Sequence, residues 1–217
     1  MAGETATLNE SEQAIFDEEW DSFISRQYRE RELIEVFERH KPQVVEALKI
    51  AKYQLEANFG GVNAATNELG WSPIQPNFIL ETSSTAKYST STWKETYLTS
   101  DVTTMWKDWI GTAAAQRAVS KYATMVLLGF HDPVDSPKIS AIKANVKGKE
   151  YPIWYVREAL LADVHVYELP KPMIIEKEQS MHLRVKVIQA GEDELSPLGV
   201  YFAKGDHLRD ESAYNKQ

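Results

Sequence analysis

The side chains of this chain that could do chemistry are scattered and match no recognised catalytic motif. The histidines, none of them in HExxH or HxH spacing, are His40, His131, His165, His182 and His207. His165 and His182 fall in expected strands and could meet across a sheet, and Asp132, beside His131, would add a carboxylate to a metal site. Isolated histidines more often have ordinary hydrogen-bond partners, so we expect no metal and no cofactor.

Two groups of charged residues have an equally ordinary explanation. The segment KGDHLR at 204–209 could bind an anion, but a charged, solvated exit from a sheet has the same composition. Glu176, Glu178 and the acids at 192–194 lie near turns, whereas glycoside hydrolysis needs two carboxyls at a defined separation across a cleft. The sequence contains no phosphate-binding P-loop, dinucleotide fingerprint or nucleophile elbow. We therefore expect a protein that is not an enzyme.

Aromatic residues in a Ser/Thr-rich region are the strongest candidates for a binding surface. They are Tyr88, Trp93, Tyr97, Trp106 and Trp109. Trp and Tyr are enriched where subunits meet. Alternatively, Tyr88, Trp93 and Trp106 could form a platform on which sugar rings stack, or all five rings could simply cover a sheet face. A groove on one protomer would favour a ligand, and a seam between two protomers would favour assembly.

An acidic helical arm or hairpin, 1–61, is expected to precede the strands. Apolar residues recur at three- and four-residue steps across Ser11–Arg39, which predicts one long amphipathic helix. Pro42 fits the start of a second helix, Gln43–Asn58, and Gly60–Gly61 fits its end. The apolar stripe of the arm includes Trp20, Phe23, Tyr28 and Phe37. Such a stripe must be buried, either on the chain's own strands or against a neighbouring subunit.

The region 62–209 predicts an antiparallel β-sandwich or jelly roll, followed by a polar tail at 210–217. Short apolar or alternating segments recur roughly every 8–12 residues, with Gly, Pro and Asp turns between them. The expected strands are Asn77–Thr82, Lys121–His131, Ile139–Val146, Glu150–Tyr155, Val164–Leu169, Met173–Glu176, His182–Ile188 and Leu198–Ala203. Between them we expect a loop at Val62–Pro76, a helical turn at Met105–Gly111, breaks at Pro170 and Pro172 and a turn at Ala190–Glu194. The fold class is α+β, mainly β.

Composition excludes several classes of function. The chain has 217 residues, 43% of them hydrophobic, and no cysteine, which rules out disulfides, thiol catalysis and zinc ribbons. No apolar run reaches the roughly 18 residues of a membrane span, and the acidic N-terminus does not resemble a signal peptide. The net charge is −8, and residues 1–40 hold eleven acids against four bases. Without a basic stripe, we expect no direct contact with nucleic acid.

The C-terminal segment Pro172–Arg209 resembles the late strands of jelly-roll structural proteins of viruses. A Pro-led apolar strand (PMIIE), a polar turn (KEQS), an alternating strand (HLRVKV) and a closing strand (LGVYFA) carry this resemblance. It covers about a fifth of the chain and concerns architecture alone, which sugar-binding modules share. The resemblance implies self-association without catalysis. The acidic arm departs from the basic arms with which many capsid proteins meet nucleic acid, so here an arm would touch protein.

These observations lead to two hypotheses. The first is a non-enzymatic structural subunit of a large assembly, most simply a virion component, that binds itself and other subunits; otherwise the protein would be cytoplasmic. Its interface residues would be Trp20, Phe23, Tyr28, Phe37, Trp93, Tyr97, Trp106 and Trp109. The second is a carbohydrate- or ligand-binding sandwich module that uses Tyr88, Trp93 and Trp106.

Overall fold

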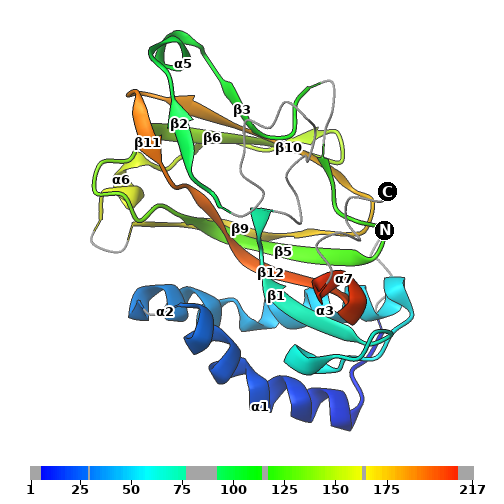
Figure 1. Ribbon diagram of the computed structural model, residues 1–217. Helices are drawn as coiled ribbons and strands as arrows, with labels where there is room; N and C mark the ends of the chain where they lie inside the picture. The colour runs from blue at the N-terminus through cyan, green and yellow to red at the C-terminus, as the bar shows by residue number, and fades with distance from the viewer. Residues whose placement is uncertain (1–5, 29, 77–91, 114–116, 163–164, 210–217) are drawn as a thin grey trace.

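Two antiparallel sheets stack face to face, and helices cover the outer side of one of them (Figure 1). The computed structural model describes residues 6–28, 30–76, 92–113, 117–162 and 165–209. Helices are α1 (Glu10–Gln27), α2 (Arg31–Arg39), α3 (Lys41–Leu55), α5 (Thr99–Thr103), α6 (Arg157–Leu160) and α7 (Gly205–Arg209), with a 3₁₀ turn η1 (Gly61–Asn63). Strands are β1 (Leu69–Pro73), β2 (Glu95–Tyr97), β3 (Lys107–Ile110), β4 (Arg117–Ala118), β5 (Ala123–His131), β6 (Ile139–Val146), β7 (Lys149–Glu150), β8 (Trp154–Tyr155), β9 (Val166–Ile175), β10 (Ser180–Val187), β11 (Gly191–Asp193) and β12 (Ser196–Lys204). The expected α+β, mainly β sandwich is confirmed.

The sheet of four strands, in the order β1-β12-β5-β9, is buried on both faces. Successive residues of β5 point to opposite sides, so Met125 and Leu127 enter the sandwich core while Val126 and Leu128 enter the core beneath the helices. This double burial explains why β5 reads as a continuous apolar run and shows no alternation.

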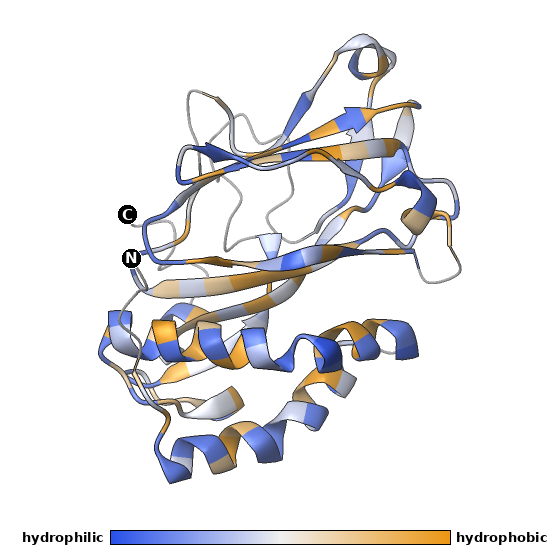
Figure 2. Cartoon of the chain, turned by 180° about the vertical axis from the view of Figure 1, so that it is seen from behind, coloured by the Kyte–Doolittle hydropathy of each residue, from blue (hydrophilic) through white to orange (hydrophobic). Residues whose placement is uncertain are grey.

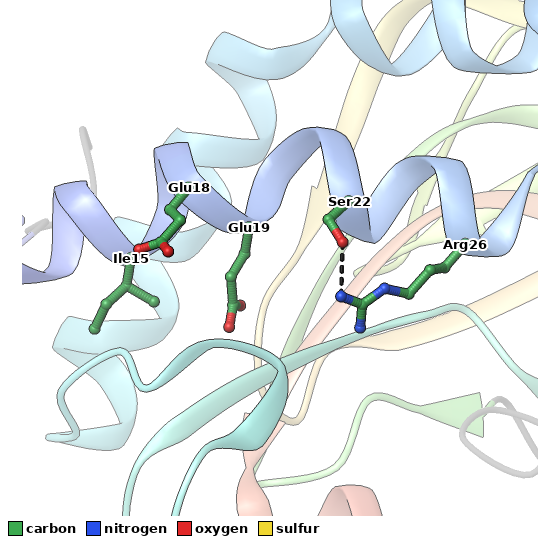
Figure 3. A pocket seen from close by; sticks show the side chains of 5 residues that line it. All are labelled: Ile15, Glu18, Glu19, Ser22 and Arg26. Atoms are coloured by element: carbon green, nitrogen blue, oxygen red, sulfur yellow. Dashed lines mark hydrogen bonds between the residues drawn. The ribbon is translucent and has the colours of Figure 1, made fainter.

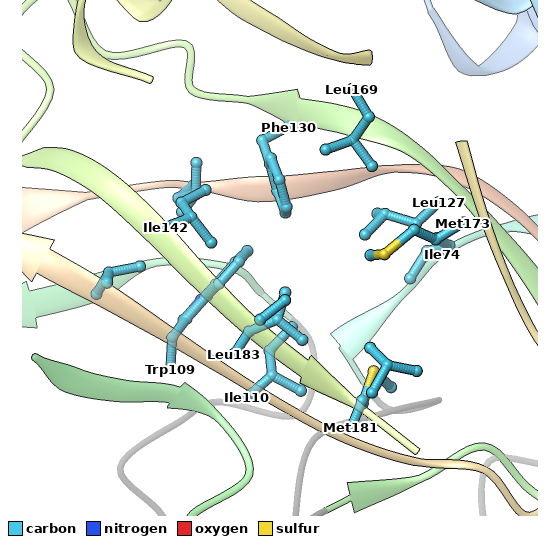
Figure 4. Packing of buried hydrophobic residues seen from close by; sticks show 14 of the residues in the cluster. Ile74, Trp109, Ile110, Leu127, Phe130, Ile142, Leu169, Met173, Met181 and Leu183 are labelled. Atoms are coloured by element: carbon cyan, nitrogen blue, oxygen red, sulfur yellow. The ribbon is translucent and has the colours of Figure 1, made fainter. Parts of the chain in front are cut away.

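The sheet of six strands follows the order β3-β10-β6-β7, with β4 also pairing β10 and β8 also pairing β6. It shows the alternation of a sheet that is buried on one face. Met181, Leu183, Val185 and Val187 of β10 enter the sandwich core, which Figure 4 shows in part. The residues between them point to the outer side.

The helical arm packs on the chain's own sheet. Phe16, Trp20 and Phe23 of α1 share a core with Trp71 of β1 and Phe202 of β12. Hydrophobic and hydrophilic residues interleave along these helices, as Figure 2 shows. The choice left open by the sequence is therefore resolved: the apolar stripe is buried within the chain.

The prediction of one helix over Ser11–Arg39 is wrong. α1 ends at Gln27, Tyr28 is extended, and α2 begins at Arg31. The bend folds the arm back on itself, and the Trp20 indole N–H donates to Glu38 Oε1 at 2.7 Å. The second predicted helix is present as α3.

Four further local predictions are corrected. The expected loop Val62–Pro76 contains β1, the expected helical turn in Met105–Gly111 is β3, and the expected turn at Ala190–Glu194 is β11. Strand pairing overrides local preference in each case. Pro170 and Pro172 do not break β9, because β9 is an edge strand and its register skips between Leu127 and Gly129 of β5. The predicted strand Asn77–Thr82 lies outside the described residues.

Candidate functional site

The elements β2, α5 and β3 form a finger that extends beyond the six-stranded sheet (Figure 1). Ion pairs inside the finger hold its shape. Lys107 Nζ lies 3.0 Å from Glu95 Oε1 and 2.7 Å from Asp101 Oδ2, and 4.7 Å from the ring centroid of Tyr97. Asp101 Oδ2 also accepts the backbone N–H of Leu98 at 2.8 Å. Because the Lys107 side chain is only 11% exposed, these contacts are shielded from water and fix the tip.

The tip of the finger presents two large apolar side chains to solvent. Leu98 is 60% exposed and Met105 is 76% exposed, one on each side of α5. The hydroxyls of Thr103 and Thr104 both donate to the backbone carbonyl of Ser100. Asp101, paired with Lys107, is the one charged residue in the sequence 98–105. A rigid, nearly uncharged and apolar tip is the kind of surface that binds another protein.

A hollow of about 360 Å³ lies along α1, at the end of the molecule opposite the finger. Its lining consists of Ile15, Glu18, Glu19, Ser22 and Arg26, which Figure 3 shows on one side of the helix. Glu19 Oε2 accepts the backbone N–H of Val62 at 2.7 Å, and Arg26 Nη2 donates to Ser22 Oγ at 2.6 Å. The hollow therefore combines one apolar side chain with polar groups that are already oriented.

Three of the four interface residues predicted on the arm are not available to a second subunit, and Tyr28 is half-buried. Trp20 and Phe37 are fully buried, Phe23 is 3% exposed, and all three belong to the core beneath the helices. Tyr28 packs against this core and stacks on Phe37 with 4.7 Å between ring centroids. The signal that suggested an interface, a stripe of large rings, came from packing within the chain.

The aromatic residues predicted after the arm divide between the sandwich core and its edge. Tyr97 and Trp109 are buried, and Trp93 packs on Trp109 with ring centroids 6.2 Å apart. Trp106 is half-buried beside Met105 of the finger tip. Among the described ring contacts none joins Trp93 to Trp106, and Tyr88 lies outside the described residues. The predicted sugar platform, which includes Tyr88, is therefore not tested by the described residues.

His165 and His182, which the sequence placed across one sheet, lie at different sheets: His182 is on β10 of the six-stranded sheet, and His165 directly precedes β9 of the four-stranded sheet. His182 Nε2 lies 2.6 Å from Asp108 Oδ1 on the six-stranded sheet, while His165 hydrogen-bonds the carbonyl of Leu160 through Nδ1. His207 stacks on Tyr122 with 3.9 Å between ring centroids, and its Nε2 lies 3.8 Å from Asp206 Oδ2. Within the described ranges, no group of three or more His, Cys, Asp or Glu side chains is arranged to hold a metal ion.

Two buried aspartates, Asp132 and Asp193, lie at the base of the finger. The sequence did not indicate that they form a pair. Asp132 follows β5 and is fully buried, and Asp193 ends β11 at 2% exposure. Asp193 Oδ2 accepts the backbone N–H of Lys138 at 2.7 Å, while Asp132 Oδ1 accepts that of Val134. Asp193 pairs with Glu95 of β2, so β11 connects the acid pair to the finger.

Asp132 and Asp193 are hydrogen-bonding partners, which requires a proton on one of the two carboxyls. Asp132 Oδ2 is buried and has no donor among the described residues unless Asp193 supplies one. Burial, with the hydrogen bond and the negative charge of Asp132, raises the pKa of Asp193 to about 7. Burial also raises the pKa of Asp132. Both shifts favour a protonated carboxyl in the pair below about pH 7.

Comparison with known proteins supplies no family. No protein-family model matches the chain, and no curated protein matches it. Among solved structures, the C-terminal CBM6 of LamC, a marine laminarinase from Zobellia galactanivorans, aligns with a TM-score of 0.24 and 6% sequence identity, over 62% of this chain and 99% of that chain. A likeness this slight establishes neither a shared ligand nor a shared role. No helix in the described part of the chain has the length and hydropathy needed to cross a membrane.

Proposed function

We propose that this protein is a non-enzymatic structural subunit that associates with copies of itself, the finger of one copy entering the α1 hollow of the next. The observation that carries this proposal is the exposure of Leu98 and Met105 on a tip whose shape is fixed by Lys107. Exposed apolar side chains cost solubility, and a rigid tip loses little entropy on binding.

A second copy is the occupant that the arrangement favours. Finger and hollow lie at opposite ends of the molecule, so one copy can bind the next in the same orientation. The hollow offers Ile15 to an apolar tip, and the polar groups of Glu18 and Ser22 to the hydroxyl residues around α5. A contact between two different surfaces of one chain is heterologous, and it generates rings or filaments.

The resemblance of the C-terminal strands to viral jelly-roll proteins suggests in which kind of assembly this subunit would take part. An assembly built from jelly-roll subunits would place the protein in a virion, with other assembly subunits as further partners. The finger takes over the role that the sequence assigned to the helical arm, because the arm's rings are used within the chain.

Mass photometry and light scattering of the full chain across a concentration series test the proposal. We expect multimers for the unaltered protein, and monomers for Met105→Asp and for Ile15→Arg. Mixing these two variants should yield dimers and nothing larger, since one retains an intact hollow and the other an intact finger. The matched control is Leu161→Asp, another exposed apolar residue, at 51% exposure, which should leave the multimers unchanged.

Two outcomes would overturn the proposal. One is an unaltered chain that remains monomeric at every concentration. The other is dissociation by Leu161→Asp to the same extent as by Met105→Asp, which would indicate a non-specific effect of added charge.

A further inference from the structure

The outer face of the six-stranded sheet carries charged residues in a regular lattice. Along β6, Ile142, Ala144 and Val146 enter the sandwich core, so Ala141, Lys143 and Asn145 point outward. Sheet register then places partners on both sides of Ala141 and Asn145 and on one side of Lys143. The pairs are Ala141 with Lys186 and Tyr155, Lys143 with Arg184, and Asn145 with His182 and Glu150.

At the level of Ala141, the outer face of the sheet has an aromatic side chain on one side of β6 and a lysine on the other. Tyr155 on β8 is 75% exposed, and it lies across β6 from Lys186 on β10, with Ala141, which is itself only 1% exposed, between them. Lys186 is exposed and makes no ion pair in the part of the chain that the structure describes. An exposed ring beside an unengaged ammonium can contact a ligand that has both an apolar face and a negative charge.

The next row already holds a carboxylate. Lys143 Nζ lies 3.0 Å from Glu150 Oε1, and Arg184 Nη2 lies 3.4 Å from the same oxygen. Glu150 is solvent-accessible, its side chain being 57% exposed, and the hydrogen bond from Lys143 lowers its pKa. The two cations are largely covered, at 22% and 26% exposure, so the sheet presents them in a fixed position. Lys143 and Arg184 therefore form a binding site for a carboxylate, in which the carboxylate of a ligand could replace that of Glu150.

We propose that this face binds an acidic sugar, a glycan whose ring carries a carboxylate. The apolar side of the ring would stack on Tyr155, and its carboxylate would pair with Lys186. A second carboxylate would replace Glu150 between Lys143 and Arg184. The inference is independent of the proposed self-association, since it uses none of the residues of the finger or the hollow.

Isothermal titration with a short oligogalacturonate tests the site, in the Met105→Asp background so that assembly plays no part. A neutral cello-oligosaccharide of equal length and a single-stranded oligothymidylate are the comparison ligands. We expect the oligogalacturonate alone to bind. Tyr155→Ala and Lys186→Gln should each weaken its binding about tenfold. Glu150→Gln should strengthen its binding a few-fold, because the internal competitor loses its charge.

Three other binding results would each contradict the proposed site. Equal binding of the neutral sugar would remove the acidic selectivity, and equal binding of the oligothymidylate would mean that any polyanion suffices. Binding of none of the three would remove the site. Thermal melts of the variants show whether each is folded, which is expected because Tyr155, Lys186 and Glu150 are all exposed.

Discussion

The two sheets of this protein differ in what lies against their outer faces. Three helices cover the four-stranded sheet and form with it a core rich in aromatic rings, centred on Trp71. The described residues on the outer face of the six-stranded sheet are instead mostly polar or charged. The covered face contributes stability, and the charged face is where a ligand can be bound without disturbing the fold.

The largest expected effect is the loss of Trp71 from the covered face. Its ring lies 4.4 Å from that of Phe23, 5.1 Å from Phe16 and 5.3 Å from Phe59, measured between centroids. Trp71→Ala should lower the free energy of unfolding by about 4 kcal/mol, because it removes a large ring from a packed core. Tyr155→Ala on the other sheet should change it by less than about 0.5 kcal/mol. Denaturant melts measure both, and equal losses would mean that the two faces do not differ as described.

The second largest effect on stability is expected from the ion pair between Glu12 of α1 and Lys52 of α3. Glu12 is 2% exposed and accepts hydrogen bonds from Lys52 and from the backbone N–H groups of Asn9 and Phe59. Burial alone would raise the pKa of Glu12, but these hydrogen bonds outweigh it and lower the pKa. The contribution of this carboxylate to stability is thus present above its unfolded pKa and is lost as pH falls through its folded pKa.

Glu12→Gln should therefore lower the free energy of unfolding at pH 7 by about 2 kcal/mol, since it leaves the Lys52 ammonium without its counter-charge. The matched control is Asp17→Asn, which removes an exposed partner 3.4 Å from Lys41 Nζ and should have almost no effect. If the two variants lost equal stability in urea, burial of the Glu12 pair would not be what matters.

The acid pair should show the opposite dependence on pH. The pKa of Asp193 is raised to about 7 in the folded protein, against about 3.9 for an unfolded aspartate. The folded chain therefore keeps a proton that the unfolded chain has lost, and stability falls as pH rises from about 4 through 7. Asp132→Asn should reduce this loss, because it removes the neighbouring negative charge and its amide can donate to Asp193 while its oxygen still accepts from Val134. Burial, the largest cause of the raised pKa of Asp193, is unchanged.

Melts of Asp132→Asn between pH 5 and 9 measure this effect. The variant should be more stable than the unaltered chain at pH 8 by about 1–2 kcal/mol, with little gain at pH 5. A gain that did not depend on pH would show that repulsion between the two carboxylates is not its cause. Since β11 connects the pair to β2, hydrogen exchange in the finger should also slow in the variant at pH 8.

Much of the sandwich could be predicted from local pattern. Alternation in β10 and the apolar run of β5 each determine which side chains are buried, and both strands lie where the pattern placed them. The failures arise where tertiary contacts decide. Residues 105–111 carry Trp106 and Trp109 at helical spacing, yet pairing with β10 makes Lys107–Ile110 a strand.

The candidate sites were harder to predict than the fold. Large rings signal burial and binding equally well, so the stripe of the arm suggested an interface that the chain uses internally. The exposure of Met105 depends on the finger, and the finger depends on Lys107 reaching Glu95 and Asp101. The acid pair joins Asp132 to Asp193, which are distant in the sequence and carry no motif. Only the three-dimensional arrangement brings such residues together.

The smallest expected effect lies at the turn between β6 and β7, at the edge of the charged sheet. Lys147 and Gly148 both have positive φ, 55° and 74°, as a two-residue hairpin turn requires. Lysine tolerates this region less well than asparagine, so Lys147→Asn should stabilise the fold by about 0.5 kcal/mol. The variant also loses the ion pair with Glu176, but that Lys147 side chain is 50% exposed and the pair contributes little. Gly148→Ala is the opposite control and should destabilise through strain alone, because no atom lies within 4 Å of an added Cβ. Glu150, whose place between Lys143 and Arg184 the proposed ligand carboxylate would take, lies in β7 directly after this turn. A loss of stability in Lys147→Asn would therefore mean that side-chain ion pairs, and not the backbone conformation, stabilise this hairpin.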